Sequence, residues 1–178
     1  MNERVFNLIF RWAGKNSLLD ALGVFLASFL LYAVIGLVVF FVFLKKRSRE
    51  RLFFLVKIAL AMILSRGIIL EVINFTFPYS RPFVLLGLKP LFEVAGPAFP
   101  SGHAITLFTL TTVVFLANWR WGLILGALSA VNGLARIFVG VHWPLDILSG
   151  AFFGILSGFL IHILLKPYQE KLIRPPVL

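Results

Sequence analysis

Three short stretches of this sequence carry polar residues of the kinds that bind and transfer phosphate. They are Arg81-Pro82, the tetrapeptide Pro100-Ser101-Gly102-His103, and the group Arg136, His142 and Asp146. Arginine matches phosphate oxygens with its planar donors, and histidine can act as a nucleophile or a general acid. A loop arginine, a helix cap and a first-turn acid would explain one residue in each stretch. None of these simpler explanations accounts for the whole set.

The second stretch predicts the start of an apolar helix that can hold an anion. Ser101 is a suitable N-cap, and the next backbone N–H groups have no partner within the helix. Gly102 lets an anion approach the backbone closely. Together with donors from Arg81 and Arg136, this helix start predicts a phosphate site.

The two histidines indicate what could happen to a phosphate bound there. Asp146 follows His142 by one helical turn, so its carboxylate can hold one imidazole nitrogen and leave the other as a nucleophile. His103, which comes from a different helix, could protonate the leaving oxygen. The arginines and helix amides would stabilise charge during in-line phosphoryl transfer.

The elements that must position these residues are membrane helices. The chain has 178 residues, of which 60% are hydrophobic, and no cysteine. Five apolar runs approach or exceed the roughly 20 residues that a spanning helix needs. They cover residues 18–44, 52–77, 101–117, 121–140 and 145–165. We therefore expect an all-α, polytopic membrane bundle with five spanning helices, forming a single domain over residues 1–178. Residues 5–12 are amphipathic and predict an N-terminal interfacial helix.

Charge predicts the orientation of the bundle. The formal net charge is +10, and the basic residues gather at the ends of the apolar runs, which favours a membrane protein over a nucleic-acid partner. The most basic connection is Lys45–Arg51, so this side is expected to face the cytoplasm. The three phosphate-handling stretches then lie on the opposite side.

Further polar residues within or beside the apolar runs are candidates for the same site. They are Arg66, Glu71, Asn74 and Lys89. Ionisable residues inside a membrane are often functional, but Arg66 and Glu71 could equally tie helices together. Lys57 is expected to extend to the cytoplasmic surface, and His162, which has no polar neighbour in sequence, is expected to be structural.

The three stretches together resemble the signature of the type 2 phosphatidic acid phosphatase family. That signature consists of a lysine, six residues and Arg-Pro, then Pro-Ser-Gly-His, then Ser-Arg, five residues, His, three residues and Asp. Two positions depart from it, because Asn74 stands in place of the lysine and Ala135 in place of the serine. The missing cation could be supplied by Lys89 or Arg66.

The resemblance implies a role for each matching residue. His142 would be the nucleophile that forms a phosphohistidine, Asp146 its partner and His103 the general acid. The phosphate would be held by Arg81, Ser101, Gly102 and Arg136. The family uses no metal or other cofactor, so none is expected here.

Within that family, residues 16–20, 80–84 and 136–150 look most like bacterial undecaprenyl-diphosphatases of the bacitracin-resistance type. Lipid A 1-phosphatases and phosphatidylglycerophosphate phosphatases share the same core. The expected partner is therefore a membrane lipid: a polyprenyl diphosphate, lipid A or phosphatidylglycerophosphate. The expected location is the bacterial cytoplasmic membrane, crossed several times, with the active site on the periplasmic or extracellular side.

Two other classes of function compete with this interpretation. Two histidines and one aspartate could form a facial metal triad, although the neighbouring arginines would repel a dication. A lipid-binding or transport protein could also keep the fold without catalysis. Such a protein would not need both His103 and His142.

Overall fold

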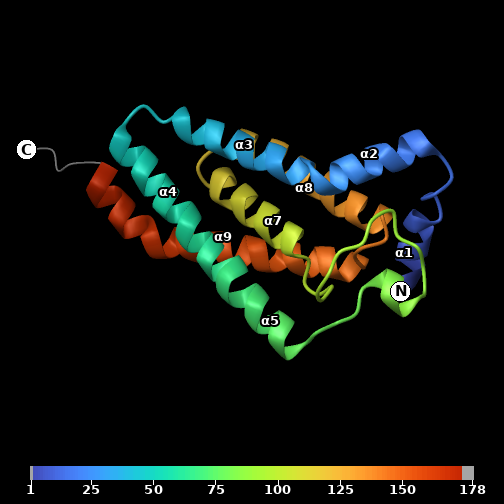
Figure 1. The fold of residues 1–178 in the computed structure, drawn as a ribbon. Helices are drawn as coiled ribbons and strands as arrows, with labels where there is room; N and C mark the ends of the chain where they lie inside the picture. Colours follow the sequence, from blue (N-terminus) through green and yellow to red (C-terminus); the bar gives the residue numbers. More distant parts are fainter. Residues whose placement is uncertain (1, 174–178) are drawn as a thin grey trace, which may run out of the picture.

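The computed structural model describes residues 2–173, and every regular element in this part of the chain is a helix (Figure 1). The elements, in chain order, are α1 (Asn2–Phe10), α2 (Ser17–Ser28), α3 (Leu30–Phe43), α4 (Ser48–Met62), η1 (Ile63–Leu70), α5 (Glu71–Thr76), α6 (Pro82–Leu85), α7 (Gly102–Phe115), α8 (Trp119–Phe138) and α9 (Pro144–Ile173). The segment η1 is a π-helical turn between α4 and α5, and the three form one continuous helix, Ser48–Thr76. The expected all-α membrane bundle is confirmed.

The expected number of five spanning helices is not confirmed. Within residues 2–173, three helices are long and apolar enough to cross a membrane, namely Ser48–Thr76, Trp119–Phe138 and the Pro144–Gln169 part of α9, and the bent pair α2 and α3 could form a fourth span. The first apolar run is not one straight helix, because α2 and α3 meet at an angle of 44°. The third run forms a helix of only 14 residues, α7, which rises about 21 Å. Ser101 is its N-cap and Phe115 its last residue, so the helix is shorter than the expected run of residues 101–117.

The bend between α2 and α3 is stabilised by polar groups of α8. Backbone carbonyls in the last turn of a helix lack intrahelical partners. Here the Nδ2 of Asn132 donates to the carbonyls of Leu26 and Ala27, at 2.7 and 3.2 Å. Arg136 adds a bond from Nη1 to Ala27 O at 3.3 Å. The bend is thus tied to the helix that carries one of the predicted phosphate-binding residues.

Helix α7 lies at the centre of the bundle, with nearly every side chain buried from Ala104 to Val114. Three glycines of α9, at every fourth position, allow the two backbones to approach closely: Gly150, Gly154 and Gly158. A Cβ at Gly154 would lie 2.7 Å from the carbonyl oxygen of Ile105. Small residues at this spacing are typical of tightly packed membrane helices. This contact fixes the start of α7 against the start of α9.

The N-terminal helix α1 covers the first turn of α9. Phe6 is fully buried, and its ring lies 5.1 Å from that of Trp143. The side-chain oxygen of Asn2 accepts a hydrogen bond from the backbone N–H of Leu145 at 3.1 Å. The amphipathic helix expected from the sequence is therefore present, and it also packs onto the loop that carries His142.

Candidate active site

The predicted site residues come from four parts of the chain that meet at one end of the bundle. The loop before α6 provides Arg81, the start of α7 provides Ser101, Gly102 and His103, the last turn of α8 provides Arg136, and the α8–α9 turn with the first turn of α9 provides His142 and Asp146. The backbone N–H of Ser101 donates to the carbonyl of Asp146 at 3.0 Å, which joins the second stretch to the third.

His142 and Asp146 form a buried pair. The Nδ1 of His142 lies 3.3 Å from Oδ2 of Asp146, and both side chains are almost fully buried. The same carboxylate oxygen accepts from the backbone N–H of Trp143 at 2.7 Å. With Nδ1–H donating to the carboxylate, the lone pair of the imidazole lies on Nε2.

His142 is held in its neutral form. Burial, followed by the positive charges of Arg136 and Arg81, lowers the pKa of His142 well below its usual range. Burial disfavours the charged imidazolium, and nearby cations add to that effect. A neutral imidazole with a free Nε2 lone pair is the form that can attack phosphorus.

Arg81 is buried, and all five of its N–H donors have a partner. Nε donates to Gly96 O, Nη1 to Val141 O, and Nη2 to the carbonyls of Ala95 and Pro97, at 2.9–3.2 Å. The remaining Nη1 hydrogen faces Nε2 of His142 at 3.4 Å. Arg81 therefore clamps the 95–97 loop onto the α8–α9 turn. Its long contact with His142 is the bond most easily transferred to a phosphate oxygen.

The guanidinium of Arg136 has an N–H donor without a hydrogen-bond partner in the described chain. It is 3% exposed, and its Nη1 contacts Ala27 O at 3.3 Å and Nε2 of His103 at 3.4 Å. Its Nε is buried and has no hydrogen-bond partner among residues 2–173. Buried polar atoms are almost always paired, so an unpaired Nε on a guanidinium indicates a place for an anion.

The start of α7 has the features predicted for it. Ser101 is buried and caps the helix, its Oγ accepting from the backbone N–H of Ala104 at 3.5 Å. His103 is half-buried, with Nε2 directed at Arg136. Gly102 packs so closely against Arg66 that a Cβ there would lie 2.8 Å from its Nη1.

The four additional candidates differ in their relation to the site. Arg66 reaches it, because its Nη1 donates to Gly102 O at 3.2 Å and lies 3.5 Å from Oγ1 of Thr106. Asn74 has a buried Oδ1 without a hydrogen-bond partner in the described part of the chain. Lys89 and Glu71 are exposed. Within residues 2–173, no hydrogen bond joins any of these last three to the site residues.

The metal-triad alternative finds no matching geometry. Among residues 2–173, no group of three or more His, Cys, Asp or Glu side chains is placed to hold a metal ion. The predicted triad is divided, since His103 faces Arg136 whereas His142 faces Asp146.

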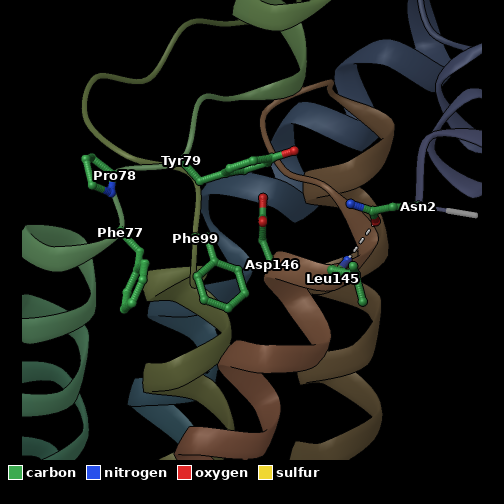
Figure 2. A pocket seen from close by; sticks show the side chains of 7 residues that line it. All are labelled: Asn2, Phe77, Pro78, Tyr79, Phe99, Leu145 and Asp146. Carbon is green, nitrogen blue, oxygen red and sulfur yellow. Dashed lines mark hydrogen bonds between the residues drawn. The ribbon is translucent and has the colours of Figure 1, made fainter.

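A cavity of about 430 Å³ lies beside Asp146, and sequence reasoning missed most of its lining. Figure 2 shows the Asp146 carboxylate pointing into this space below Tyr79, with Phe99 and Phe77 on one side and Leu145 and Asn2 on the other. The only signal in the sequence was the cluster of aromatic residues just before Arg81. Nothing in the sequence indicated that Asn2 lines this cavity, because its position depends on the packing of α1 against α9.

Comparisons with known proteins agree with this architecture. A sequence profile described as the PAP2 superfamily matches residues 54–169. Undecaprenyl-diphosphatase BcrC from Bacillus subtilis (strain 168) is 28% identical over 181 residues, covering 98% of this chain and 91% of the relative. The crystal structure of LpxE from Aquifex aeolicus matches 90% of this chain and 93% of its own with a TM-score of 0.71 and 28% identity. A PAP2 type phosphatidylglycerolphosphate phosphatase from Bacillus subtilis has a TM-score of 0.63 over 97% of this chain and 88% of its own. At 20% identity it supports the fold alone.

Proposed function

The chain belongs to the PAP2 superfamily and is a bacterial membrane enzyme that hydrolyses lipid phosphates, and we propose that its substrate is undecaprenyl diphosphate. A relative named for this activity aligns with nearly the whole chain. We propose further that residues 1–178 form one phosphatase domain without a metal or other cofactor. Lipid A and phosphatidylglycerophosphate are the alternative substrates, because a relative is named lipid A 1-phosphatase and a phosphatidylglycerolphosphate phosphatase has the same fold.

The proposed reaction proceeds through His142. Its Nε2 attacks the terminal phosphorus, the bond from phosphorus to the bridging oxygen breaks, and undecaprenyl phosphate leaves. Water then attacks the phosphohistidine and releases inorganic phosphate. The observation that carries this proposal is the pairing of Nδ1 with Asp146 at 3.3 Å, which leaves Nε2 beside the Arg81 guanidinium at 3.4 Å.

The transferring phosphoryl group would be held by donors around Nε2. The unpaired Nε of Arg136 is one such donor, and the Nη1 of Arg81 that now faces His142 is another. The first amides of α7, after Ser101, would bind a third oxygen. His103 contacts Arg136 at 3.4 Å and would protonate the leaving oxygen, then accept a proton from the attacking water.

Arg66 is proposed to supply the cation that the family lysine would have supplied. Asn74, at the lysine position, carries no charge, whereas the guanidinium of Arg66 lies against the first turn of α7. Only one of its nitrogens, Nη1, is hydrogen-bonded within the described chain, so Nε and Nη2 remain available to a phosphate oxygen.

The lipid part of the substrate is proposed to enter through the cavity beside Asp146. Its walls are largely aromatic and aliphatic (Figure 2), which suits the first isoprenoid units next to the diphosphate. The site lies at the end of the bundle opposite the basic Lys45–Arg51 segment (Figure 1). By the positive-inside rule the site would face the periplasm or the extracellular side of the cytoplasmic membrane.

The test is phosphate release by the purified protein in detergent with EDTA, comparing undecaprenyl diphosphate, lipid A and phosphatidylglycerophosphate at equal surface concentration. We expect release from undecaprenyl diphosphate that His142→Ala abolishes. An alkaline quench with substrate labelled in the terminal phosphate should trap label on the wild-type protein and none on His142→Ala. Faster release from another lipid would reassign the substrate, and activity that requires an added metal would overturn the mechanism.

A further inference from the structure

A second polar cavity lies at the other end of the bundle from the active site. Its volume is about 300 Å³, and it is enclosed by α4, the end of α7 and α9. The polar residues that line it are Lys45, Glu50, Lys57, His162 and Gln169. None of them has a role in the proposed reaction.

Lys57 is the most unusual residue of this cavity. It is only 3% exposed, and its Nζ lies 2.7 Å from Nδ1 of His162. The sequence analysis expected Lys57 to extend to the cytoplasmic surface, and it found no polar neighbour of His162 along the sequence. The expectation for Lys57 is wrong, because the packing of α4 against α9 buries it and brings it to His162 across 105 positions of the chain.

This pair leaves hydrogen-bond donors unused. An ammonium has three donors and no acceptor, and among the described side chains of residues 2–169 the hydrogen-bond partner of Lys57 is His162 alone. Because Lys57 donates to Nδ1, the imidazole hydrogen lies on Nε2 and is a further donor. A buried ammonium whose only partner is an uncharged ring is costly unless an anion completes its surroundings.

Two lysines and one glutamate are the charged side chains of the described cavity lining. Lys45 is half-buried, with its Nζ 5.0 Å from the centre of the Phe41 ring. Glu50 is the one carboxylate among the lining side chains that the structure describes; it lies 4.0 Å from Arg47 and forms no salt bridge with either lysine there. Two ammonium groups thus share a space much larger than one water molecule.

We propose that this cavity binds a phosphate-bearing anion, held by Lys45, Lys57 and His162. The anion is either the headgroup of an anionic phospholipid or free inorganic phosphate, since the recognition chemistry is the same. The proposal is independent of the phosphatase reaction. Its site lies at the opposite end of α7, near Leu116, whereas the reaction site is near Ser101.

The experiment measures thermal unfolding of the purified full-length protein in detergent. One arm titrates inorganic phosphate against chloride at equal ionic strength, and the other titrates phosphatidylglycerol against phosphatidylcholine in mixed micelles. The variants are Lys57→Met, Lys45→Met and His162→Gln. Lys46→Met is the matched control, because Lys46 is exposed and does not line the cavity but carries the same charge.

We expect a ligand-dependent rise in unfolding temperature for the wild type and for Lys46→Met. For Lys57→Met and Lys45→Met the apparent dissociation constant should rise at least tenfold. A response to phosphate identifies the free anion, and a response to phosphatidylglycerol alone identifies the headgroup. If Lys57→Met does not fold, Lys45→Met and His162→Gln give the result. Equal responses in the wild type and these variants, or no response in either arm, would overturn the proposal.

Discussion

Changing each of the two buried arginines to lysine tests a proposed difference between them. Arg81 mainly holds the backbone together, whereas Arg136 keeps a donor for the phosphate. Lysine keeps the charge but replaces a planar fork of five donors with a single ammonium. In Arg136→Lys the loss falls on Nε, the donor that has no partner in the described chain. In Arg81→Lys it falls on bonds to Gly96, Ala95, Pro97 and Val141, which hold the loop to the α8–α9 turn.

The expected magnitudes follow from these bonds. A hydrogen bond to a charged group contributes about 1.5–3 kcal/mol, so losing one to the transition state should lower kcat/KM of Arg136→Lys roughly 10- to 150-fold. Its unfolding temperature should change little, because Ala27 O, which loses the bond from Arg136, keeps the bond from Asn132. Arg81→Lys should lower the free energy of unfolding by about 1–3 kcal/mol for each buried carbonyl left unpaired.

The assay combines kcat/KM on undecaprenyl diphosphate in mixed micelles with chemical denaturation in the same detergent. Full activity in Arg136→Lys would refute the assignment of its Nε to the phosphate. A loss of stability in Arg136→Lys as large as that in Arg81→Lys would show that both arginines are structural.

Three further predictions concern packing, protonation and the missing lysine. Gly154→Ala should destabilise the protein by about 1–3 kcal/mol in denaturant titrations, because the new Cβ would clash with the carbonyl oxygen of Ile105. The control is Gly126→Ala, whose Cβ would lie 3.6 Å from a methyl group and should leave the stability unchanged. The pKa of His142 is lower in the folded state than in the unfolded chain, so stability should rise with pH up to about 6.5 and then level off. The difference in unfolding temperature between pH 5 and pH 7.5 should therefore shrink in His142→Gln. Arg66→Gln should lower kcat/KM, and adding Asn74→Lys should restore part of it; an unchanged kcat/KM in Arg66→Gln would remove Arg66 from the phosphate site.

Much of the site could be predicted because its signals are local in sequence. A cap residue such as Ser101 acts on amides a few positions away, and the one-turn spacing of His142 and Asp146 allows their contact. The membrane setting follows from composition and from apolar runs long enough to span. The membrane fold and the family were therefore accessible from the chain alone.

The number and shape of the spans were less predictable. The break at Phe29 occurs in an apolar run whose only charged residue is Asp20. Asn132 and Arg136, far away in the chain, supply hydrogen-bond partners for the carbonyls of Leu26 and Ala27 at the break. The close contact of the three α9 glycines with α7 was likewise set by the tertiary structure, which brings the two helices together.

The sequence by itself determined which chemical groups are present, their local spacing and the solvent that surrounds them. Only the tertiary structure decided which donors remain free. Arg81 and Arg136 are the same residue type in the same signature, yet Arg81 gives four of its five donors to backbone carbonyls and the fifth to His142, whereas Arg136 keeps an unpaired Nε. The same holds for Lys57, whose partner His162 lies on another helix. The physical reason is that a buried side chain forms hydrogen bonds with the groups that the fold brings within about 3 Å of it. The local spacing of residues along the sequence does not determine which groups these are.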